Sequence, residues 1–313
     1  MKDFVIGIDR MEMKDFVIGI GRINIDMIYS GLERLPSLGE EVYSKGFEIH
    51  LGGGAPGEAV ILSKLGVPAK IITWLGSSMF AEIARSEFRI GNPEIIDLYQ
   101  GNGNPLVLSS AMLCEGDRTF LSWCDEVTPT DADIERIRRE HRDAKIVLLS
   151  PLYPEIYEGL NLTGSVKIFD TGWEDDLSHE NPKYHRFLEQ ADYYLPNRRE
   201  ALKMTGTASV DEAAEVLSHY FEHVIIKVDS EGCLIRDAEG TRVIPPLRGI
   251  EAVDATGAGD AFLSGFTYGV YHGYSVDDCV RFGNITGGTC VQAYGCLTKT
   301  LTESELLSTF HSL

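Results

Sequence analysis

An aspartate follows a glycine-rich turn in the C-terminal third of the chain, in the stretch VDATGAGDAFLSGF at residues 253–266. Gly257 and Gly259 let the backbone approach a ligand closely, and the apolar spacing that follows predicts an amphipathic helix. The free N–H groups at the start of such a helix attract anions. The Asp260 carboxylate stands beside them and can take a proton from a hydroxyl while they hold a transferring phosphoryl group. The turn alone also fits a structural role, since an aspartate in a first helical turn favours the positive end of the helix dipole.

The rest of the chain predicts a scaffold that could position this carboxylate. Short β-rich apolar runs alternate with segments of helical period. The expected strands are 16–20, 70–75, 145–150, 166–170 and 224–228, and the expected helices include 59–65, 131–141 and 211–220. From residue 257 the pattern is helical, with candidates at 261–271, 276–293 and 303–310. This order predicts an α/β fold, a three-layer α/β/α sandwich with a mostly parallel central sheet.

Two regions break the alternation and predict a small β-sheet lid. Residues 41–50, and the pair 106–113 and 119–123, look like strands without helices between them, and the pair turns through Glu115-Gly116-Asp117. We expect segments roughly 25–50 and 98–126 to form this lid near the C-terminal ends of the main strands, where open α/β folds bind ligands. No low-complexity linker divides residues 13–313, so they are predicted to form one domain.

The N-terminus contains a perfect duplication, because residues 1–8 and 13–20 both read MKDFVIGI. The copies are too short and too identical to be repeats of a solenoid. We interpret Met13 as the natural start and residues 1–12 as a cloning or start-site duplication. The alternative is a real additional edge strand.

Composition narrows the class of partner. A formal net charge of −20 argues against nucleic acid or an anionic membrane surface, because phosphate backbones are held by clustered Lys and Arg. No apolar stretch approaches the roughly 20 residues that span a bilayer. The six cysteines form no C-x-x-C pair and have no histidine at metal-ligand spacing, which favours a reduced, cytoplasmic location. A small molecule is the expected partner.

The motif D-x-T-G-A-G-D-x-F at residues 254–262 resembles the C-terminal signature of the ribokinase-like (PfkB-type) carbohydrate and nucleoside kinases. Other segments are similar to that family's elements in their usual order: GRINID at 21–26, LPSLGE at 35–40, GGGAP at 52–56, N-x-x-E at 197–200, and 224–232. The resemblance covers nearly all of the chain from Met13. It implies ATP-dependent phosphorylation of a primary hydroxyl on a sugar or sugar-like molecule, with a nucleoside kinase of the same fold as an alternative.

The resemblance also implies roles for individual residues at the reacting end. Asp260 would be the general base, and the N–H groups of Gly257, Ala258 and Gly259 would form the anion hole. The substrate hydroxyls would be held by Asn24, Asp26, Gly53, Gly54 and Gly57. Dimerisation through lid strands is a further expectation from the family, since pairing covers exposed strand edges.

For the nucleotide, the resemblance implies that Asn197 and Glu200 organise Mg²⁺, with Glu200 acting through water, because this cation dehydrates reluctantly. Residues 197–200 also read as a capping box that opens a helix. The weaker nucleotide-side candidates are Lys227, Asp229, Gly232, Thr256 and Asn284. Some relatives need a monovalent cation such as K⁺, and its site here would comprise Asp254, Thr256, Cys290 and Gly295.

Departures from the family pattern leave the substrate open. Gly57, followed by Glu58, stands where the family usually has an asparagine that contacts the sugar. The usual G-D-D segment reads Gly76-Ser77-Ser78 and loses its acidic residues. Sugars, sugar acids and nucleosides therefore all remain candidates.

Three other functions compete with the kinase. The segment G-I-G-R-I-N at 19–24 superficially resembles a dinucleotide-binding fingerprint, but it lacks the third glycine and a following helix. No G-x-x-x-x-G-K-[ST] occurs, which argues against a P-loop kinase. The third competing function is that of a sugar-binding or regulatory protein that kept the fold but lost the chemistry. A sugar would stabilise such a protein without requiring Mg-ATP.

Overall fold

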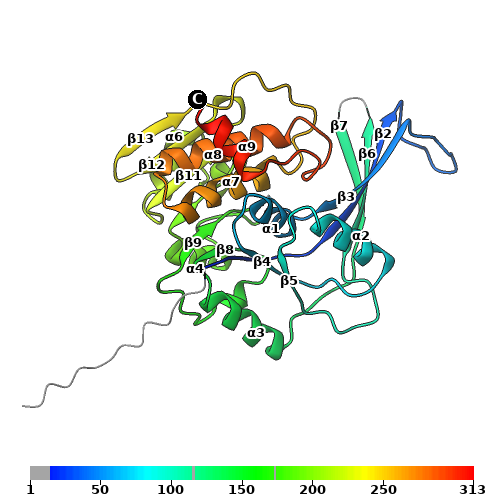
Figure 1. The fold of residues 1–313 in the computed structure, drawn as a ribbon, viewed down its shortest axis with the longest axis horizontal. Helices are drawn as coiled ribbons and strands as arrows, with labels where there is room; N and C mark the ends of the chain where they lie inside the picture. The colour runs from blue at the N-terminus through cyan, green and yellow to red at the C-terminus, as the bar shows by residue number, and fades with distance from the viewer. Residues whose placement is uncertain (1–14, 115–116, 173) are drawn as a thin grey trace, which may run out of the picture.

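The computed structural model describes residues 15–114, 117–172 and 174–313, which form a nine-stranded main sheet and a separate four-stranded sheet. The main sheet has the order β13-β12-β11-β10-β9-β8-β1-β4-β5. Figure 1 shows it in the body of the molecule, with the smaller sheet standing to one side. The predicted α/β fold is confirmed. The duplicated residues 1–12 lie outside the described residues, as do Glu115 and Gly116 of the expected turn.

The main strands pair in parallel from β5 to β11, and the β11–β12 and β12–β13 pairs are antiparallel. Their bounds are β1 (Val17–Ile20), β4 (Ala69–Thr73), β5 (Glu94–Asp97), β8 (Ile146–Leu149), β9 (Val166–Phe169), β10 (Tyr193–Tyr194), β11 (His223–Lys227), β12 (Cys233–Asp237) and β13 (Gly240–Ile244). Five of these correspond to the strands expected from sequence. The short β5 and β10 and the β12–β13 hairpin did not stand out in the apolar pattern.

Both faces of the main sheet are buried because its side chains alternate between two apolar clusters. In β1, Val17 belongs to one cluster and Ile18 to the other, and Ile71 and Ile72 divide in the same way in β4. Successive side chains of a strand point to opposite faces, so each cluster lies on one face of the sheet. Burial on both faces is typical of parallel strands with helices on either side.

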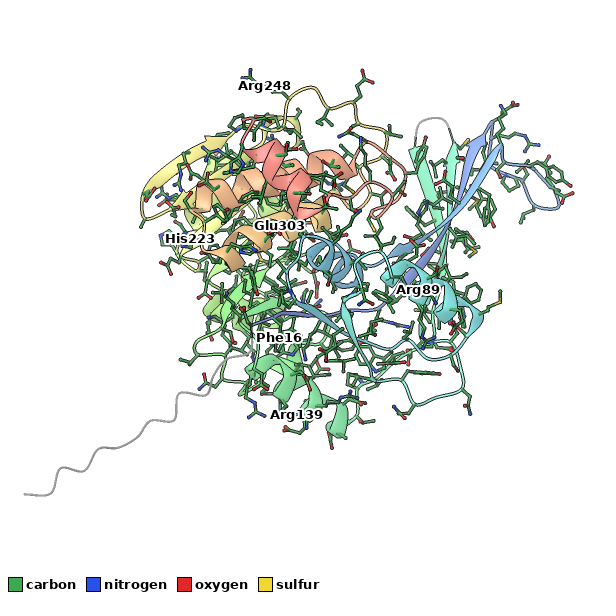
Figure 2. The ribbon with its side chains drawn as sticks, viewed as in Figure 1. Phe16, Arg89, Arg139, His223, Arg248 and Glu303 are labelled. Carbon is green, nitrogen blue, oxygen red and sulfur yellow. The ribbon has the colours of Figure 1, made fainter. Side chains whose placement is uncertain are left out.

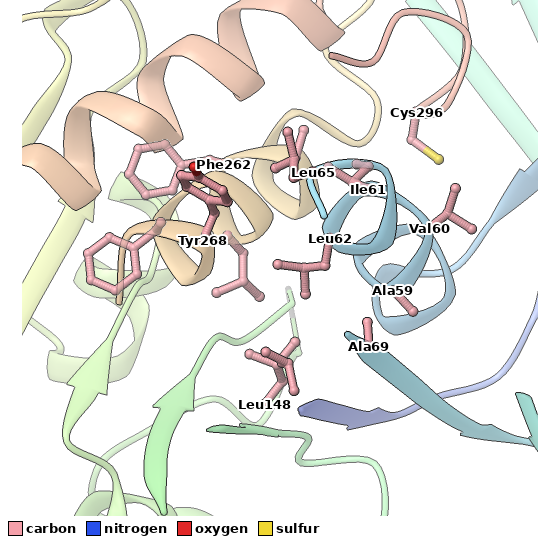
Figure 3. Close-up of a cluster of buried hydrophobic side chains, with 14 of the residues drawn as sticks. Ala59, Val60, Ile61, Leu62, Leu65, Ala69, Leu148, Phe262, Tyr268 and Cys296 are labelled. Carbon is pink, nitrogen blue, oxygen red and sulfur yellow. The ribbon is translucent and has the colours of Figure 1, made fainter. Parts of the chain in front are cut away.

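The helices contribute to these two clusters in separate sets, which gives three layers. One cluster includes side chains of α1 (Gly54–Lys64), α2 (Met79–Phe88), α7 (Ala258–His272), α8 (Val276–Cys290) and α9 (Glu303–Phe310). The other includes α3 (Asp131–Arg142), α4 (Pro182–Gln190), α5 (Arg198–Thr205) and α6 (Val210–Leu217). Figure 3 shows the buried side chains of α1 beside Phe262 and Tyr268 of α7.

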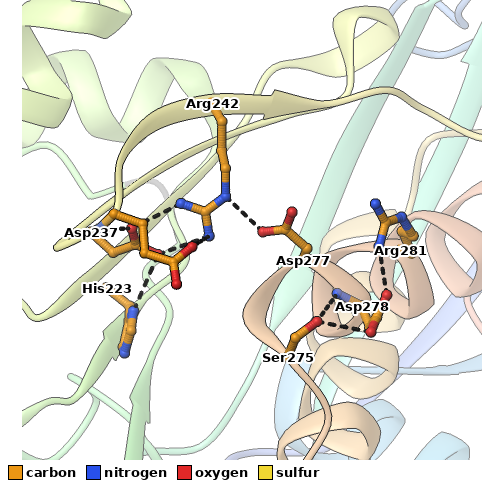
Figure 4. A network of polar contacts seen from close by, with 8 residues as sticks. His223, Asp237, Arg242, Ser275, Asp277, Asp278 and Arg281 are labelled. Atoms are coloured by element: carbon orange, nitrogen blue, oxygen red, sulfur yellow. Dashed lines mark hydrogen bonds and ion pairs between the residues drawn. The ribbon is translucent and has the colours of Figure 1, made fainter.

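Polar contacts attach the outer elements to this core. Tyr268 donates a hydrogen bond of 3.0 Å to Glu303, labelled in Figure 2, at the start of α9. Arg242 of β13 donates to both oxygens of Asp237 at 2.8 and 2.9 Å and to Asp277 of α8 at 2.7 Å (Figure 4). These bonds connect the antiparallel β12–β13 hairpin to α8. The helix expected at 276–293 ends at Cys290.

The four-stranded sheet, which we call the lid sheet, has the order β3-β2-β6-β7. Its strands are β2 (Asn24–Leu32), β3 (Gly46–Gly52), β6 (Val107–Cys114) and β7 (Asp117–Trp123). The strand expected from Glu41 begins only at Gly46, because residues 41–45 belong to the exposed loop that returns β2 to β3. Every helix within the described residues is too short or too polar to span a membrane.

Candidate active site

A cavity of about 970 Å³ lies along the C-terminal ends of the parallel strands, where open α/β sheets bind ligands. Its walls come from the ends of β1, β8, β9 and β11, from the first turns of α1 and α7, and from α8. Its ionisable lining residues include Glu58, Asp170, Glu200, Lys227 and Asp260. Most of them are far apart in sequence, so the sheet topology brings them together.

The glycine turn before α7 places Asp260 in this cavity. Gly257 is the N-cap of α7 with φ +75°, and a Cβ there would overlap Cys296, so the turn requires glycine. Asp260 is the third residue of the helix and does not cap it, since α7 has no side-chain cap. The N–H of Ala258 makes a long turn bond of 3.3 Å to Ala255, and in the described part of the chain Gly257 and Gly259 have no such acceptor. The helix therefore begins with N–H groups free to hold an anion.

The surroundings of Asp260 suit it to accept a proton. Burial raises its pKa, and the nearby negative charge of Asp170 raises it further, while Lys227 opposes both, with a result of about 6. A carboxylate with this pKa is mostly ionised at neutral pH and is a better base than an ordinary aspartate.

Lys227, at the end of β11, is a buried cation in the middle of the acidic cavity. Its ammonium lies 2.7 Å from Asp170 Oδ2, at the end of β9, and both side chains are largely buried. Burial lowers the pKa of Lys227, but Asp170 and Glu200 raise it more, so the lysine stays charged. A Cβ built on Gly259 would lie 3.8 Å from Lys227 Nζ. The ammonium is therefore next to the start of α7, where the free N–H groups are.

Asn197 and Glu200 form the predicted capping box at the start of α5. Glu200 accepts hydrogen bonds of 2.9 Å from the Asn197 N–H and 2.7 Å from the Asn197 amide, and the Asn197 amide oxygen accepts from the Glu200 N–H. Burial raises the pKa of Glu200 to about 7, with a further contribution from Asp170. Both residues line the cavity, so the capping role and a ligand-binding role are compatible.

These residues fit an outer-sphere magnesium site better than a direct one. In the described ranges, no cluster of three or more His, Cys, Asp or Glu side chains could hold a metal ion. Glu200 has both oxygens engaged by Asn197, which leaves lone pairs for water molecules. Mg²⁺ commonly binds through one or two carboxylates, water and the substrate phosphates, so one oriented carboxylate facing the cavity is sufficient.

Three of the weaker nucleotide-side candidates also line the cavity: Asp229, Gly232 and Asn284. Gly232 has φ +96°, and a Cβ there would overlap backbone atoms of Ile244, the last residue of β13, and of the two prolines after it, so this turn also requires glycine. Asn284 of α8 donates to the Pro245 carbonyl at 2.9 Å. Leu247 and nearby apolar residues complete this wall, which is suited to a flat ring.

The residues expected to hold the substrate divide into two groups. Gly54 lines the cavity, whereas Asn24, Asp26, Gly53 and Gly57 are not among the lining residues. Asp26 lies on β2 opposite His50 of β3, on the lid sheet, and its pKa is raised by burial. A Cβ on Gly57 would face Cys296 at 3.6 Å rather than the cavity.

The four residues expected at a monovalent cation site are brought together around the turn before α7. Asp254 accepts from the Thr256 N–H at 2.9 Å, from its hydroxyl at 2.7 Å and from the Gly295 N–H at 3.3 Å. Cys290 contacts the Thr256 carbonyl at 3.6 Å. Thr256 is not itself a lining residue of the cavity.

Sequence reasoning missed three charged residues of the cavity: Arg22, Glu58 and Asp170. Asp170 carried a usable signal, since it directly follows a buried strand whose carboxyl end faces the ligand edge. Glu58 also carried one, because it is an acidic residue in the otherwise apolar stretch of α1. Arg22 donates to the carbonyls of Pro105 and Asp125, contacts that its position in the sequence does not indicate.

Comparisons with known proteins identify the family of the chain. Residues 14–303 match the family described as pfkB family carbohydrate kinase. A sugar kinase of Archaeoglobus fulgidus, described as uncharacterized, is 36% identical over 111 residues, 35% of this chain and 44% of the relative. A cytidine kinase of Thermococcus kodakarensis is 33% identical over 156 residues, 47% of this chain and 55% of the relative. The matched regions thus span about half of these two relatives.

A solved structure shares the fold over almost the whole chain. It is the ribokinase of Arabidopsis thaliana complexed with ribose and ATP, with a TM-score of 0.79 and 22% identity, covering 95% of this chain and 99% of that one. At 22% identity, this structural similarity shows that the two chains share a fold. Together with the match over residues 14–303, it confirms the family predicted from the sequence motifs: the chain belongs to the pfkB family of carbohydrate kinases.

Proposed function

We propose that the protein transfers the γ-phosphoryl group of ATP to a hydroxyl of a sugar, nucleoside or similar small molecule, with Asp260 as the general base. The observation that carries this proposal is the position of Asp260. Its carboxylate lies in a large cavity at the N-terminus of α7, within the electrostatic reach of the buried Lys227 ammonium. Membership of the pfkB family supports the same chemistry.

In the proposed step, the acceptor hydroxyl donates its proton to the Asp260 carboxylate as its oxygen attacks the γ-phosphorus. One oxygen–phosphorus bond forms, the bond to the leaving ADP oxygen breaks, and the proton stays on Asp260 until it is released to water. The N–H groups of Gly257 and Gly259, with Lys227, hold the negative charge of the transferring group.

Asn197 and Glu200 would hold magnesium through water on the nucleotide side. When bound, this ion neutralises phosphate charge. The protein's own contribution there is orientation, because the capping box fixes the Glu200 carboxylate towards the cavity. The adenine would occupy the apolar wall near Leu247 and Asn284, and a monovalent cation would support the turn at Asp254 and Thr256.

The lid sheet supports a proposal about assembly. Several large apolar side chains of this region are exposed, including Tyr43, Phe47, Phe120, Leu121 and Trp123. β3 and β7 are also open edges of a four-stranded sheet. Exposed apolar strand edges of this kind invite pairing, so we propose a homodimer through the lid sheet. The free cysteines in the described residues fit a cytoplasmic location, where ATP is available.

Replacing the base tests the central assignment. Asp260→Asn should lower kcat on the order of 100-fold or more, while Mg-ATP still raises the melting temperature as in the parent. ADP release would be measured from Mg-ATP against a panel of pentoses, hexoses, sugar acids and nucleosides. Full turnover in the variant would contradict the role of Asp260. A parent that binds a sugar without any turnover would favour a binding protein.

The pKa of Asp260 sets the pH dependence. The base must be ionised, so kcat/KM should fall as pH drops through about 6, approaching tenfold per pH unit below it. The measurement needs an acceptor without groups that titrate between pH 4 and 8. A rate that stays constant down to pH 4.5 would show that this carboxyl has an ordinary pKa or is not the base.

The Lys227–Asp170 pair should be essential for both stability and activity. Lys227→Met leaves Asp170 buried without its cation and should cost about 3–5 kcal/mol in urea unfolding, and the double variant Asp170→Asn/Lys227→Met should recover part of this. Lys45→Met is the matched control, because its ion pair with Glu33 is exposed on both sides and should contribute less than about 1 kcal/mol. Equal costs for the two single variants would contradict the central role of Lys227.

The molecular mass of the protein in solution tests the proposed homodimer. Light scattering after gel filtration should give about twice the chain mass of 34.6 kDa. Trp123→Glu on β7 should shift the parent dimer to monomer, whereas Val243→Glu, an equally exposed position on β13, should not. A monomeric parent, or a dimer that Trp123→Glu leaves intact, would refute pairing through the lid sheet.

A further inference from the structure

The cavity contains one acidic side chain for which the proposed mechanism has no use, that of Glu58. It lies in α1, is 7% exposed, and lines the cavity. Within the described residues, no donor or cation forms a hydrogen bond or ion pair with its carboxylate, whereas the Glu200 carboxylate is bonded to Asn197. An ionised carboxylate without a partner is costly to bury, so the free protein holds Glu58 in its neutral form, and a cation entering the cavity would let it ionise.

Glu58 and Asp260 present their carboxyl groups to the same side of Gly54. A Cβ built on Gly54 would be 3.1 Å from Asp260 Oδ1 and 3.3 Å from Glu58 Oε1, so both carboxylates converge on the same point. Gly54 has no side chain to separate them. A ligand whose hydroxyl meets Asp260 therefore brings its neighbouring substituent close to Glu58.

The charges around Glu58 favour a cation as that substituent. Burial raises its pKa well above the usual value, and the charges of Asp260 and Asp170 raise it further. Two cations also line the cavity: Lys227 is paired with Asp170 at 2.7 Å, and Arg22 donates to the carbonyls of Pro105 and Asp125. A carboxylate or phosphate on the acceptor would meet the charge of Asp260 and gain no charged partner at Glu58, while an ammonium would lower the pKa of Glu58 and form a charge-assisted hydrogen bond with its carboxylate.

We propose that Glu58 is a specificity-determining residue that selects an acceptor carrying a protonated amine close to the phosphorylated hydroxyl, such as an amino sugar. The claim that this amine is phosphorylated rests on the proposed kinase function, whereas the claim that the amine binds at Glu58 does not. It narrows the acceptors left open by the sequence, because sugar acids and sugar phosphates are repelled by Asp260, and neutral sugars bring no cation that would let Glu58 ionise.

The test compares matched acceptors with the full chain. The amines are the 2-, 3- and 4-amino-deoxy forms of D-glucose and the 2- and 3-amino-deoxy forms of D-ribose, each beside its parent sugar and the corresponding aldonic acid. At a pH where the amine is protonated, at least one amine should exceed its parent sugar in kcat/KM by 10-fold or more, and its acid by a larger factor. A neutral sugar or an acid as the best acceptor in both series would overturn the proposal.

Glu58→Gln separates charge recognition from other effects. The variant keeps the shape of the side chain and removes its charge, so it should fold at least as well as the parent, which its melting temperature checks. It should lower kcat/KM for the preferred amine by about 10- to 100-fold, the range expected for a charge-assisted bond, and lower kcat/KM for the parent sugar by a clearly smaller factor. Glu189→Gln, on the exposed side of α4, is the matched control and should change neither. Equal losses on amine and neutral acceptors would contradict charge recognition.

A binding measurement distinguishes failure of this inference from failure of the kinase proposal. Without nucleotide, the preferred amine should raise the melting temperature of the unmodified protein but not that of Glu58→Gln. The corresponding neutral sugar should raise the melting temperature of both proteins less than the amine raises that of the unmodified protein. Stabilisation without any turnover would support Glu58 recognition and contradict the kinase proposal. Turnover of neutral or acidic acceptors without a preference for amines would support the kinase proposal and contradict recognition by Glu58. If no amine is turned over or stabilises the parent, the inference fails.

Discussion

The active-site region depends on one buried ammonium, that of Lys227. The ammonium pairs with Asp170, and its charge also acts on Glu200, Asp260 and Glu58. Without it, these four carboxyl groups would share one cavity with no buried ammonium among them. Like charges at this spacing in a low-dielectric site cannot all remain ionised without a counter-charge. Lys227 therefore limits the rise in the pKa of Asp260 to a value that still leaves an effective base at neutral pH. The same charge lies beside the N–H groups that are proposed to hold the phosphoryl group.

The parallel sheet makes this arrangement possible because it collects the carboxyl ends of distant strands at one edge. Asp170 follows β9 and Lys227 ends β11, with only the two-residue β10 between those strands. Helix α7 reaches the same edge with its N-terminus, and α1, which packs against α7, brings Glu58 to it from the N-terminal half. The buried faces of the sheet are apolar, so its edge is the place where a polar cluster can be solvated by ligands.

Features encoded locally could be predicted from the sequence, and features created by topology could not. The glycine turn before Asp260 and the capping box at Asn197 each depend on a few consecutive residues, and both have the predicted form. The convergence of Glu58 on Asp260 joins residues about 200 positions apart, so no spacing rule reveals it. The alignment directed attention to Gly57, whereas it is the next residue, Glu58, that the helix turns into the cavity, and a Cβ on Gly57 would face Cys296. β10 was missed because it has only two residues, and β5 was missed because charged residues at both of its ends leave only two apolar residues between them.

The ionisation of Asp260 is the most direct test of the account. Carbon-13 NMR of the carboxyl groups as a function of pH, with the Asp260 signal identified by its absence in Asp260→Asn, measures this group without any substrate. The account predicts a midpoint near pH 6 in the parent. A midpoint near 3.8, the ordinary value for an aspartate, would show that burial and Asp170 do not act on this carboxyl as described, and would contradict the proposed base.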